Sequence, residues 1–142
     1  MVAQLSDLEL LALFDSPSIK IGDCAVVELG KRSSNLVVEA VQNHQLKTRN
    51  GKVRATSYLS RWGRSYKEAF PALMILAADK NKEVVSNALL DVVLWRDLSV
   101  LPTLKALYAE RKNPDYLKAI EALEKGDHRI YSKYFAPDKR WD

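Results

Sequence analysis

Residues 70–92 read Phe-Pro-Ala-Leu-Met-Ile-Leu-Ala-Ala-Asp-Lys-Asn-Lys-Glu-Val-Val-Ser-Asn-Ala-Leu-Leu-Asp-Val, and this stretch decides the fold. It contains two segments with the apolar spacing of helices, separated by a short turn. The second segment, which continues to about residue 96, is apolar nearly all round. A helix of that kind suits the middle of a stack, where neighbours cover it on several sides.

The same arrangement recurs through the chain at a nearly constant interval. Four segments open with an apolar residue that a small residue follows about a turn later; they begin at Ile21, Val53, Val84 and Tyr116, which are 32, 31 and 32 residues apart. The segments 70–76 and 101–107 also match at a shift of 31, each with proline in second place, where we expect a kink. A period of this length predicts stacked helical hairpins, which bury their apolar faces only against one another.

Capping signals agree with this phasing. Ser6-x-x-Glu9 and Ser65-x-x-Glu68 are capping boxes, and Asn113-Pro114 places a capping residue before a proline suited to the first helical position. Gly30, Gly63 and Gly126 stand where helices should stop. The predicted helices cover residues 6–15, 18–31, 34–43, 51–62, 65–78, 82–96, 98–111 and 114–125.

The pattern of Leu-x-x-Leu, a turn, Val-Arg or a similar pair, then Ala and Leu-Gly resembles HEAT repeats, notably their short bacterial form. The resemblance implies an all-α fold, an α-solenoid of about four HEAT-like helical hairpins in a single domain over 1–142. The hairpins are expected at about 6–31, 34–63, 65–96 and 98–126. The second carries about four extra residues before Val53. The tail 127–142 is expected to cap the last hairpin with Ile130, Tyr131, Tyr134, Phe135 and Trp141.

The net charge of +4 hides an uneven distribution of charged residues. Residues 1–39 hold six acids and three bases, residues 40–67 hold seven bases and no acid, and residues 68–142 hold twelve of each. The whole positive excess therefore lies in one segment of 28 residues. A localised excess of this kind indicates a binding partner more clearly than a modest net charge does.

Within this segment, arginine and aromatic residues suggest a partner-binding surface. Arg54, Ser57 and Arg61 share one helical face, and Arg64 extends that line if the helix continues. The expected partner-binding residues are Lys47, Arg49, Lys52, Arg54, Tyr58, Arg61, Trp62, Arg64 and Tyr66. Arginines suit carboxylates or phosphates, and the aromatic residues add flat contact surfaces. Two alternatives stay open: Arg54 stands where a HEAT arginine often contacts a loop acid of the stack, and Trp62 lies on the apolar stripe of the core.

No pattern in the sequence indicates catalysis, a metal site or a cofactor. His44 and His128 have no ligand-spaced partner and are interpreted as surface residues. Cys24 is placed in the core beside Ala25, and Asp15 is assigned to a turn or helix start, as is Asp23.

A second reading of the HEAT resemblance is a DNA glycosylase. Some HEAT-like solenoids of that class use a Trp and an Asp on the concave face, and Trp62, Trp95 and Asp91 could be placed in those roles. The chain looks too short for that family, and no matching motif surrounds these residues. We therefore expect no enzyme.

The sequence favours a non-catalytic protein-binding module. Stand-alone bacterial HEAT-like proteins of this size include immunity proteins that neutralise a cognate toxin, often a nuclease, by plugging its active site. The alternative is a nucleic-acid-binding protein that uses residues 44–67. A cytoplasmic location is expected, because the chain has one cysteine, no apolar run of the ~18 residues that a membrane span needs, and no signal peptide pattern.

Overall fold

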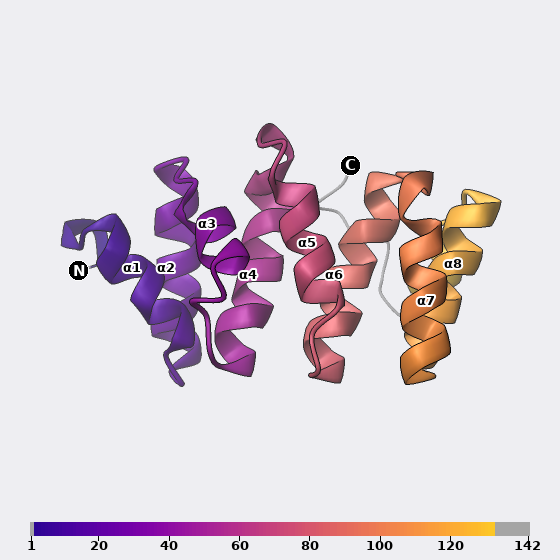
Figure 1. Ribbon diagram of the computed structural model, residues 1–142. Helices are drawn as coiled ribbons and strands as arrows, with labels where there is room; N and C mark the ends of the chain where they lie inside the picture. Colours follow the sequence, from indigo (N-terminus) through magenta and orange to yellow (C-terminus); the bar gives the residue numbers. More distant parts are fainter. Residues whose placement is uncertain (1, 133–142) are drawn as a thin grey trace.

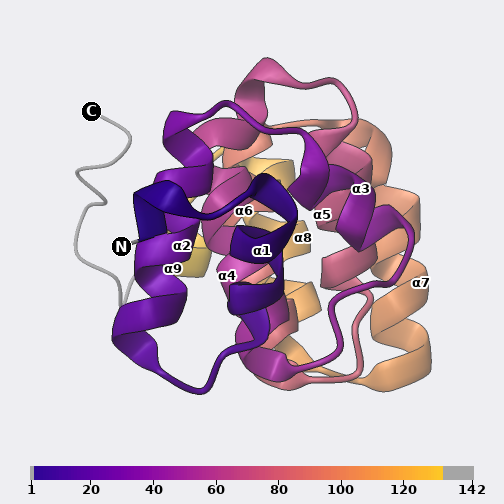
Figure 2. The ribbon, with the colours of Figure 1, turned by 90° about the vertical axis from the view of Figure 1, so that its left-hand side faces the viewer.

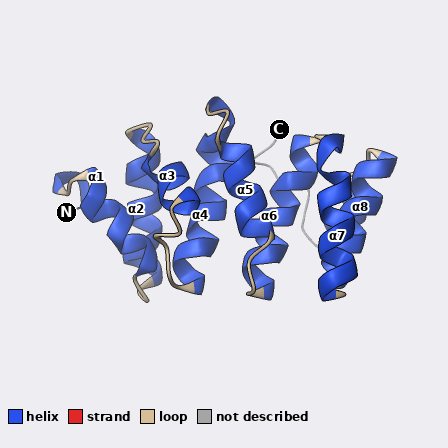
Figure 3. Cartoon of the chain, viewed as in Figure 1, coloured by secondary structure: helices blue, strands red, loops and turns tan. Residues whose placement is uncertain are grey.

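The computed structural model describes residues 2–132, with Ser65 described by its backbone alone, and in this part of the chain it is helical and has no strand (Figures 1 and 3). The α-helices are α1 (Asp7–Ala12), α2 (Ile19–Lys31), α3 (Leu36–Gln42), α4 (Arg49–Trp62), α5 (Ala69–Ala77), α6 (Lys82–Trp95), α7 (Leu101–Arg111), α8 (Pro114–Lys125) and α9 (Arg129–Ser132). The short 3₁₀ turns are η1 (Val2–Gln4), η2 (Leu13–Asp15), η3 (Gly63–Ser65) and η4 (Leu98–Val100). The prediction of an all-helical chain is confirmed over these residues.

The helices form four pairs that follow one another in chain order along the molecule (Figure 1). The first helix of each pair is joined to the second by a turn at the lower edge of this view. Seen from the N-terminal end, α3, α5 and α7 lie on one side, with α2, α4, α6 and α8 beside them (Figure 2). Helix α4 contacts α2 and α6, and α6 contacts α4 and α8. These two central helices are therefore covered by helices of both neighbouring pairs.

Helix α6 shows how the sequence builds this arrangement. The side chain of Asn81 accepts hydrogen bonds from the N–H groups of Glu83 and Val84, at 2.9 and 3.2 Å, and so caps the helix start. The helix then buries apolar side chains on more than one side, which are Val84, Val85, Ala88, Leu89, Val92 and Val93. Each valine or leucine among them contributes roughly 1.5–3 kcal/mol when it is fully buried.

Two glycines on α2 allow α4 to pack closely against it. A Cβ on Gly22 would lie 2.0 Å from the guanidinium carbon of Arg54, and one on Gly30 would lie 2.3 Å from the indole of Trp62. Both glycines are therefore packing positions. The predicted end of this helix near Gly30 is confirmed, since α2 ends one residue later, at Lys31.

Tyrosine hydroxyls fix connections and neighbouring pairs through backbone carbonyls. The hydroxyl of Tyr58 on α4 donates to the carbonyl of Ser34 at 2.6 Å. Tyr116 on α8 donates in the same way to the carbonyl of Ala77, at the end of α5. These phenols are buried with their polar ends satisfied, which is the arrangement that makes a buried tyrosine stabilising.

The α-helices α1 to α8 begin within three residues of the predicted starts except α5, which begins four residues later. The capping box of Ser6 and Glu9 is present, and Asn113 caps α8. Helix α5 begins at Ala69, with Glu68 as its N-cap and no side-chain cap, so the predicted capping box at residues 65–68 is wrong. Pro71 and Pro102 lie in the first turns of α5 and α7, where no backbone N–H is needed, and not at kinks inside longer helices.

The C-terminal part of the expected cap is only partly described. Ile130 and Tyr131 lie on α9, which packs against α6 and α8, and the hydroxyl of Tyr131 donates to the carbonyl of Ser86 at 2.8 Å. Tyr134, Phe135 and Trp141 lie outside the described residues.

Cys24 is exposed, and its prediction as a core residue is wrong. The buried positions of α2 are Gly22, Ala25, Val26, Leu29 and Gly30. Successive residues of a helix are rotated by about 100°, so the position before Ala25 points away from this stripe. Among residues 2–132, no helix has the length and apolar character needed to cross a membrane.

Candidate functional site

The basic segment 44–67 covers the α3–α4 loop, the whole of α4 and the turn η3. Helix α4 has 14 residues and is therefore about 20 Å long. The basic residues divide between its two ends, with Lys47, Arg49 and Lys52 at the start and Arg61 and Arg64 at the finish. The segment therefore does not form one continuous patch.

Arg54, in the middle of α4, is a structural residue. Its side chain is only 9% exposed. It donates hydrogen bonds to the carbonyls of Phe14 at 2.7 Å, Ser16 at 2.6 Å and Ser18 at 3.1 Å. The interpretation of Arg54 as a residue that holds the stack together therefore fits these contacts. Its guanidinium donates chiefly to carbonyls of the turn between α1 and α2, and not chiefly to a loop acid.

Tyr58 is also inside the stack. Its side chain is 0% exposed, between Phe14 and Trp62 at ring-centroid distances of 6.3 and 5.3 Å. Burial raises the pKa of its hydroxyl to about 12. The expectation that Tyr58 offers a flat surface to a partner is wrong, because the apolar stripe of α4 carries it into the core.

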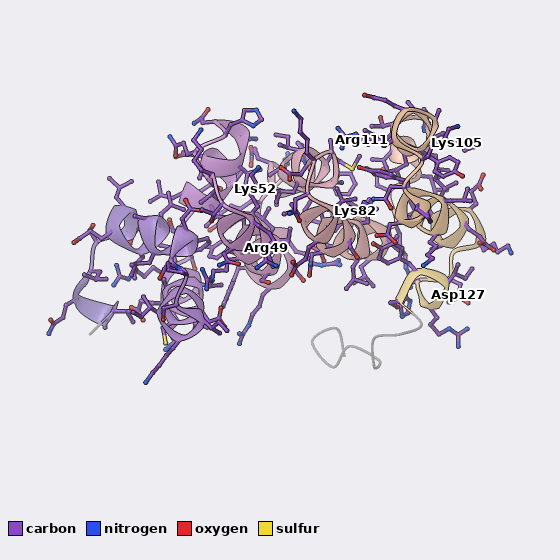
Figure 4. The ribbon with its side chains drawn as sticks, turned by 90° about the horizontal axis from the view of Figure 1, so that it is seen from below. Arg49, Lys52, Lys82, Lys105, Arg111 and Asp127 are labelled. Atoms are coloured by element: carbon purple, nitrogen blue, oxygen red, sulfur yellow. The ribbon has the colours of Figure 1, made fainter. Side chains whose placement is uncertain are left out.

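The basic residues at the start of α4 are bound to the third pair. Arg49 forms an ion pair with Glu83, and the Lys52 ammonium lies 2.7 Å from the carboxylate of Asp79. Figure 4, seen from the edge of the turns, shows Arg49 and Lys52 close to Lys82 of the adjoining pair. Two of the expected partner-binding cations are thus engaged within the molecule.

Asp79 is held from both sides. Burial favours its neutral form, but hydrogen bonds from Lys52 and the Asn81 N–H, together with the charges of Lys52 and Arg111, hold its pKa below the usual value. The guanidinium of Arg111 in the fourth pair donates to the carbonyl of Asp79 at 2.7 Å. The turn between α5 and α6 therefore receives cations from both neighbouring pairs.

The other end of α4 carries two arginines that lie over indole rings. The guanidinium carbon of Arg61 is 4.7 Å from the ring centroid of Trp62, and that of Arg64 is 5.5 Å from the ring centroid of Trp95. Both arginines are exposed, and both tryptophans are half-buried. We call these four residues the Arg-Trp ridge.

Arg61 and Trp62 end α4, and Trp95 ends α6. Arg64 lies in the connection between α4 and α5, which reaches higher than the other connections in the view of Figure 1. Trp95 stacks on Phe70 with ring centroids 5.1 Å apart, which anchors one indole. Trp62 packs on Tyr58 and over Gly30, so the core alternative for Trp62 is correct for much of its ring. The expected partner residue Tyr66 is half-buried, and its hydroxyl donates to the carbonyl of Ser33 at 2.5 Å.

A pocket of about 170 Å³ lies beside the α3–α4 loop. Its lining comes from α3, that loop, the first residues of α4 and the end of α5, and consists of Ala40, Val41, His44, Leu46, Lys47, Lys52, Ile75, Leu76 and Asp79. The sequence pointed to Lys47 and Lys52. It gave no sign of the walls from α5, because 23 residues separate Lys52 from Ile75.

The residues considered for catalysis have other surroundings. Asp15 accepts hydrogen bonds from the N–H and hydroxyl of Thr48, at 3.1 and 2.5 Å, and so holds the α3–α4 loop. Asp91 is 2% exposed, between α4 and α6. Over residues 2–132, no group of three His, Cys, Asp or Glu side chains has an arrangement that suits a metal ion. No family model, curated protein or solved structure matches the chain.

Proposed function

We propose that this chain is a protein-binding module built as a HEAT-like α-solenoid, and that its Arg-Trp ridge binds an acidic surface of another protein. The observation that carries this proposal is a pair of exposed arginines, Arg61 at the end of α4 and Arg64 in the turn η3 that follows, each with its guanidinium over a tryptophan ring.

The chemistry of the ridge resembles that of strong protein interfaces. Tryptophan, tyrosine and arginine are enriched among the few residues that dominate binding energy between proteins. The planar guanidinium of arginine suits a carboxylate, and stacking on an indole leaves it fewer rotamers to lose on binding. Arg61 and Arg64 thus supply charge, and the indoles supply apolar area that is already ordered.

Intramolecular contacts count against the nucleic-acid alternative. Of the seven bases in residues 40–67, Arg49 and Lys52 are paired with acids and Arg54 is buried on carbonyls. The others are divided between two ends of α4. A nucleic-acid backbone is bound chiefly through many cations that face its phosphates together.

The HEAT resemblance extends the proposal to an inhibitor of a bacterial toxin. Charge then restricts the mode of binding, since a nuclease cleft that holds phosphates is itself basic and would repel the ridge. We propose that an inhibitor of this kind meets an acidic surface of its toxin, outside any phosphate-binding cleft.

The solenoid proposal draws on the order of the four pairs and on equal spacings. Gly22 and Arg54 are 32 residues apart, as are Gly30 and Trp62, so contacts between α2 and α4 repeat the interval found in the sequence. Tyr131 on α9 covers part of α6, and the proposal includes a C-terminal cap that continues from there.

A double charge reversal tests the binding proposal. Arg61→Glu with Arg64→Glu should abolish capture of the partner from the native host, read by mass spectrometry, and should leave the melting temperature within about 2–4 °C of the wild type. Lys20→Glu with Lys118→Glu makes the same charge change at exposed positions and should retain the partner.

Binding to arbitrary DNA or RNA at low salt supplies the opposing outcome. Tight, salt-sensitive binding by the wild type, lost in the Arg61→Glu, Arg64→Glu protein, would establish the nucleic-acid alternative. Unfolding of that variant would show that the ridge belongs to the stack, and the proposed site would be wrong.

A further inference from the structure

The pocket beside the α3–α4 loop has the size of a single small group. Its volume is about 170 Å³. Pockets for drug-sized ligands usually measure roughly 300–1,000 Å³, whereas an apolar cavity of about 150 Å³ is enough to admit benzene. A pocket of this size is too small for a cofactor and suits one ring or one short branched chain.

The floor of the pocket is apolar. Val41 and Ala40 come from α3, Leu46 comes from the loop, and Ile75 and Leu76 come from α5. Ile75 is only half-buried, so part of its side chain remains available to a ligand. An apolar group placed there would remove its own surface and the exposed part of Ile75 from water.

The rim of the pocket carries two ammonium groups. The Lys47 Nζ donates to the carbonyl of His44 at 2.7 Å, and the Lys52 Nζ donates to Asp79 at 2.7 Å. An ammonium has three donors, so each lysine keeps donors beyond the one that these bonds use. Asp79 balances one of the two charges, which leaves the rim with a positive excess beside an apolar floor.

We infer that this pocket is a binding site for an apolar group of about the size of a benzene ring that bears a carboxylate. The ring or chain lies on the floor, and the carboxylate accepts hydrogen bonds from Lys47 and Lys52 at the rim. The site is separate from the Arg-Trp ridge. Lys52 and Arg61 are nine residues apart on α4, which turns their side chains to opposite sides of the helix.

Phenylacetate is a suitable probe, observed by ¹H–¹⁵N correlation NMR of the whole chain. Shifts should concentrate at residues 40–52 and 75–79, with a Kd on the order of 1 mM, because so small a ligand buries little surface. Benzyl alcohol should bind at least about tenfold more weakly, since it lacks the charge that the lysines meet, and benzylamine should not bind.

Two variants connect binding to the pocket. Lys47→Glu should weaken phenylacetate binding at least about tenfold, whereas the matched reversal Lys118→Glu on α8 should leave it unchanged. Ile75→Phe adds volume to the floor and should block binding while the far-UV circular dichroism stays helical. If Ile75→Phe unfolds, the comparison of Lys47→Glu with Lys118→Glu still tests whether phenylacetate binds in this pocket.

The source of the ligand is settled by a second comparison. A hexapeptide that ends in phenylalanine, with a free terminal carboxylate, presents the same chemistry at the end of a protein chain. Tighter binding of this peptide than of phenylacetate would assign the site to a chain terminus, and weaker binding would assign it to a free organic acid. Equal affinity for phenylacetate and benzylamine, or unchanged binding by the Lys47→Glu protein, would overturn the inference.

Discussion

Arg54 is the residue on which the contact between the first two pairs most depends. Its guanidinium satisfies three carbonyls of the turn between α1 and α2, and it passes over Gly22, where a side chain would block it. Only an arginine has a planar group with enough donors to serve three acceptors at once. Arginine and glycine here form one unit.

We expect Arg54→Ala to lower the free energy of unfolding by about 2–4 kcal/mol, because one buried and two partly buried carbonyls lose a charged donor. Arg54→Lys should recover only part of this loss, since an ammonium cannot span the same carbonyls. Urea unfolding measures both. The comparison variant is Arg61→Ala, an exposed position, which should stay within about 0.5 kcal/mol of the wild type. Equal losses at the two arginines would contradict the structural role.

Tyr58 gives the stability a dependence on alkaline pH. Its pKa is about 12 in the folded chain, against about 10 for an ordinary tyrosine, so the folded state keeps a proton that the unfolded state loses. This contribution is fully present below about pH 10 and is lost as the pH rises toward 12, at up to roughly 1.4 kcal/mol per unit. In urea unfolding between pH 10 and 12, the free energy of unfolding should fall less steeply with pH for Tyr58→Phe than for the wild type. Parallel slopes in the two proteins would mean that Tyr58 ionises without unfolding.

Helix ends are where elements depart most from expectation. Ser33, His44, Arg96 and Lys112 all have φ between 53° and 57°, the left-handed conformation that usually takes glycine at such ends. Gly126 fits that rule, with φ of 64°. Gly63 and Gly126 are the C-cap residues of α4 and α8, but other helix ends of the described residues use a left-handed residue that is not glycine.

Arg96→Gly should raise the free energy of unfolding by about 0.5–1 kcal/mol, because it relieves a left-handed backbone at the end of α6. Arg96→Ala keeps the Cβ and should change stability by less than about 0.5 kcal/mol. Thermal and urea unfolding of both proteins provide the measurement. A glycine variant no more stable than the alanine variant would show that this conformation carries no strain.

The sequence predicted elements better than it predicted contacts. The interval of 31 or 32 residues located all eight main helices, since period and caps are local properties. It could not show that Arg49 and Lys52 are neutralised by Glu83 and Asp79, because pairing across neighbouring helix pairs leaves no local sign. Cys24 was misplaced for a related reason, as one position along a helix changes the direction of a side chain by about 100°.

On the scale of the whole molecule, protection should decrease from the centre to the ends. Helices α4 and α6 have neighbours on both sides, whereas α1 is covered from one side only (Figure 1). Opening free energies usually follow such differences in burial. Native-state hydrogen exchange should therefore be slowest in α4 and α6 and faster in α1. Uniform protection in all the helices would indicate a single cooperative unit without weaker ends.

The contacts of Gly22 with Arg54 and of Gly30 with Trp62 each join residues 32 positions apart. The entropy lost on closing a chain segment depends on the length of that segment and rises only slowly with it. Each step of assembly in this row therefore closes a segment of similar length, however many pairs the chain contains. In a longer array built on the same plan, the sequence separation between contacting residues would not increase. Its folding rate would therefore be set by one step between neighbouring pairs.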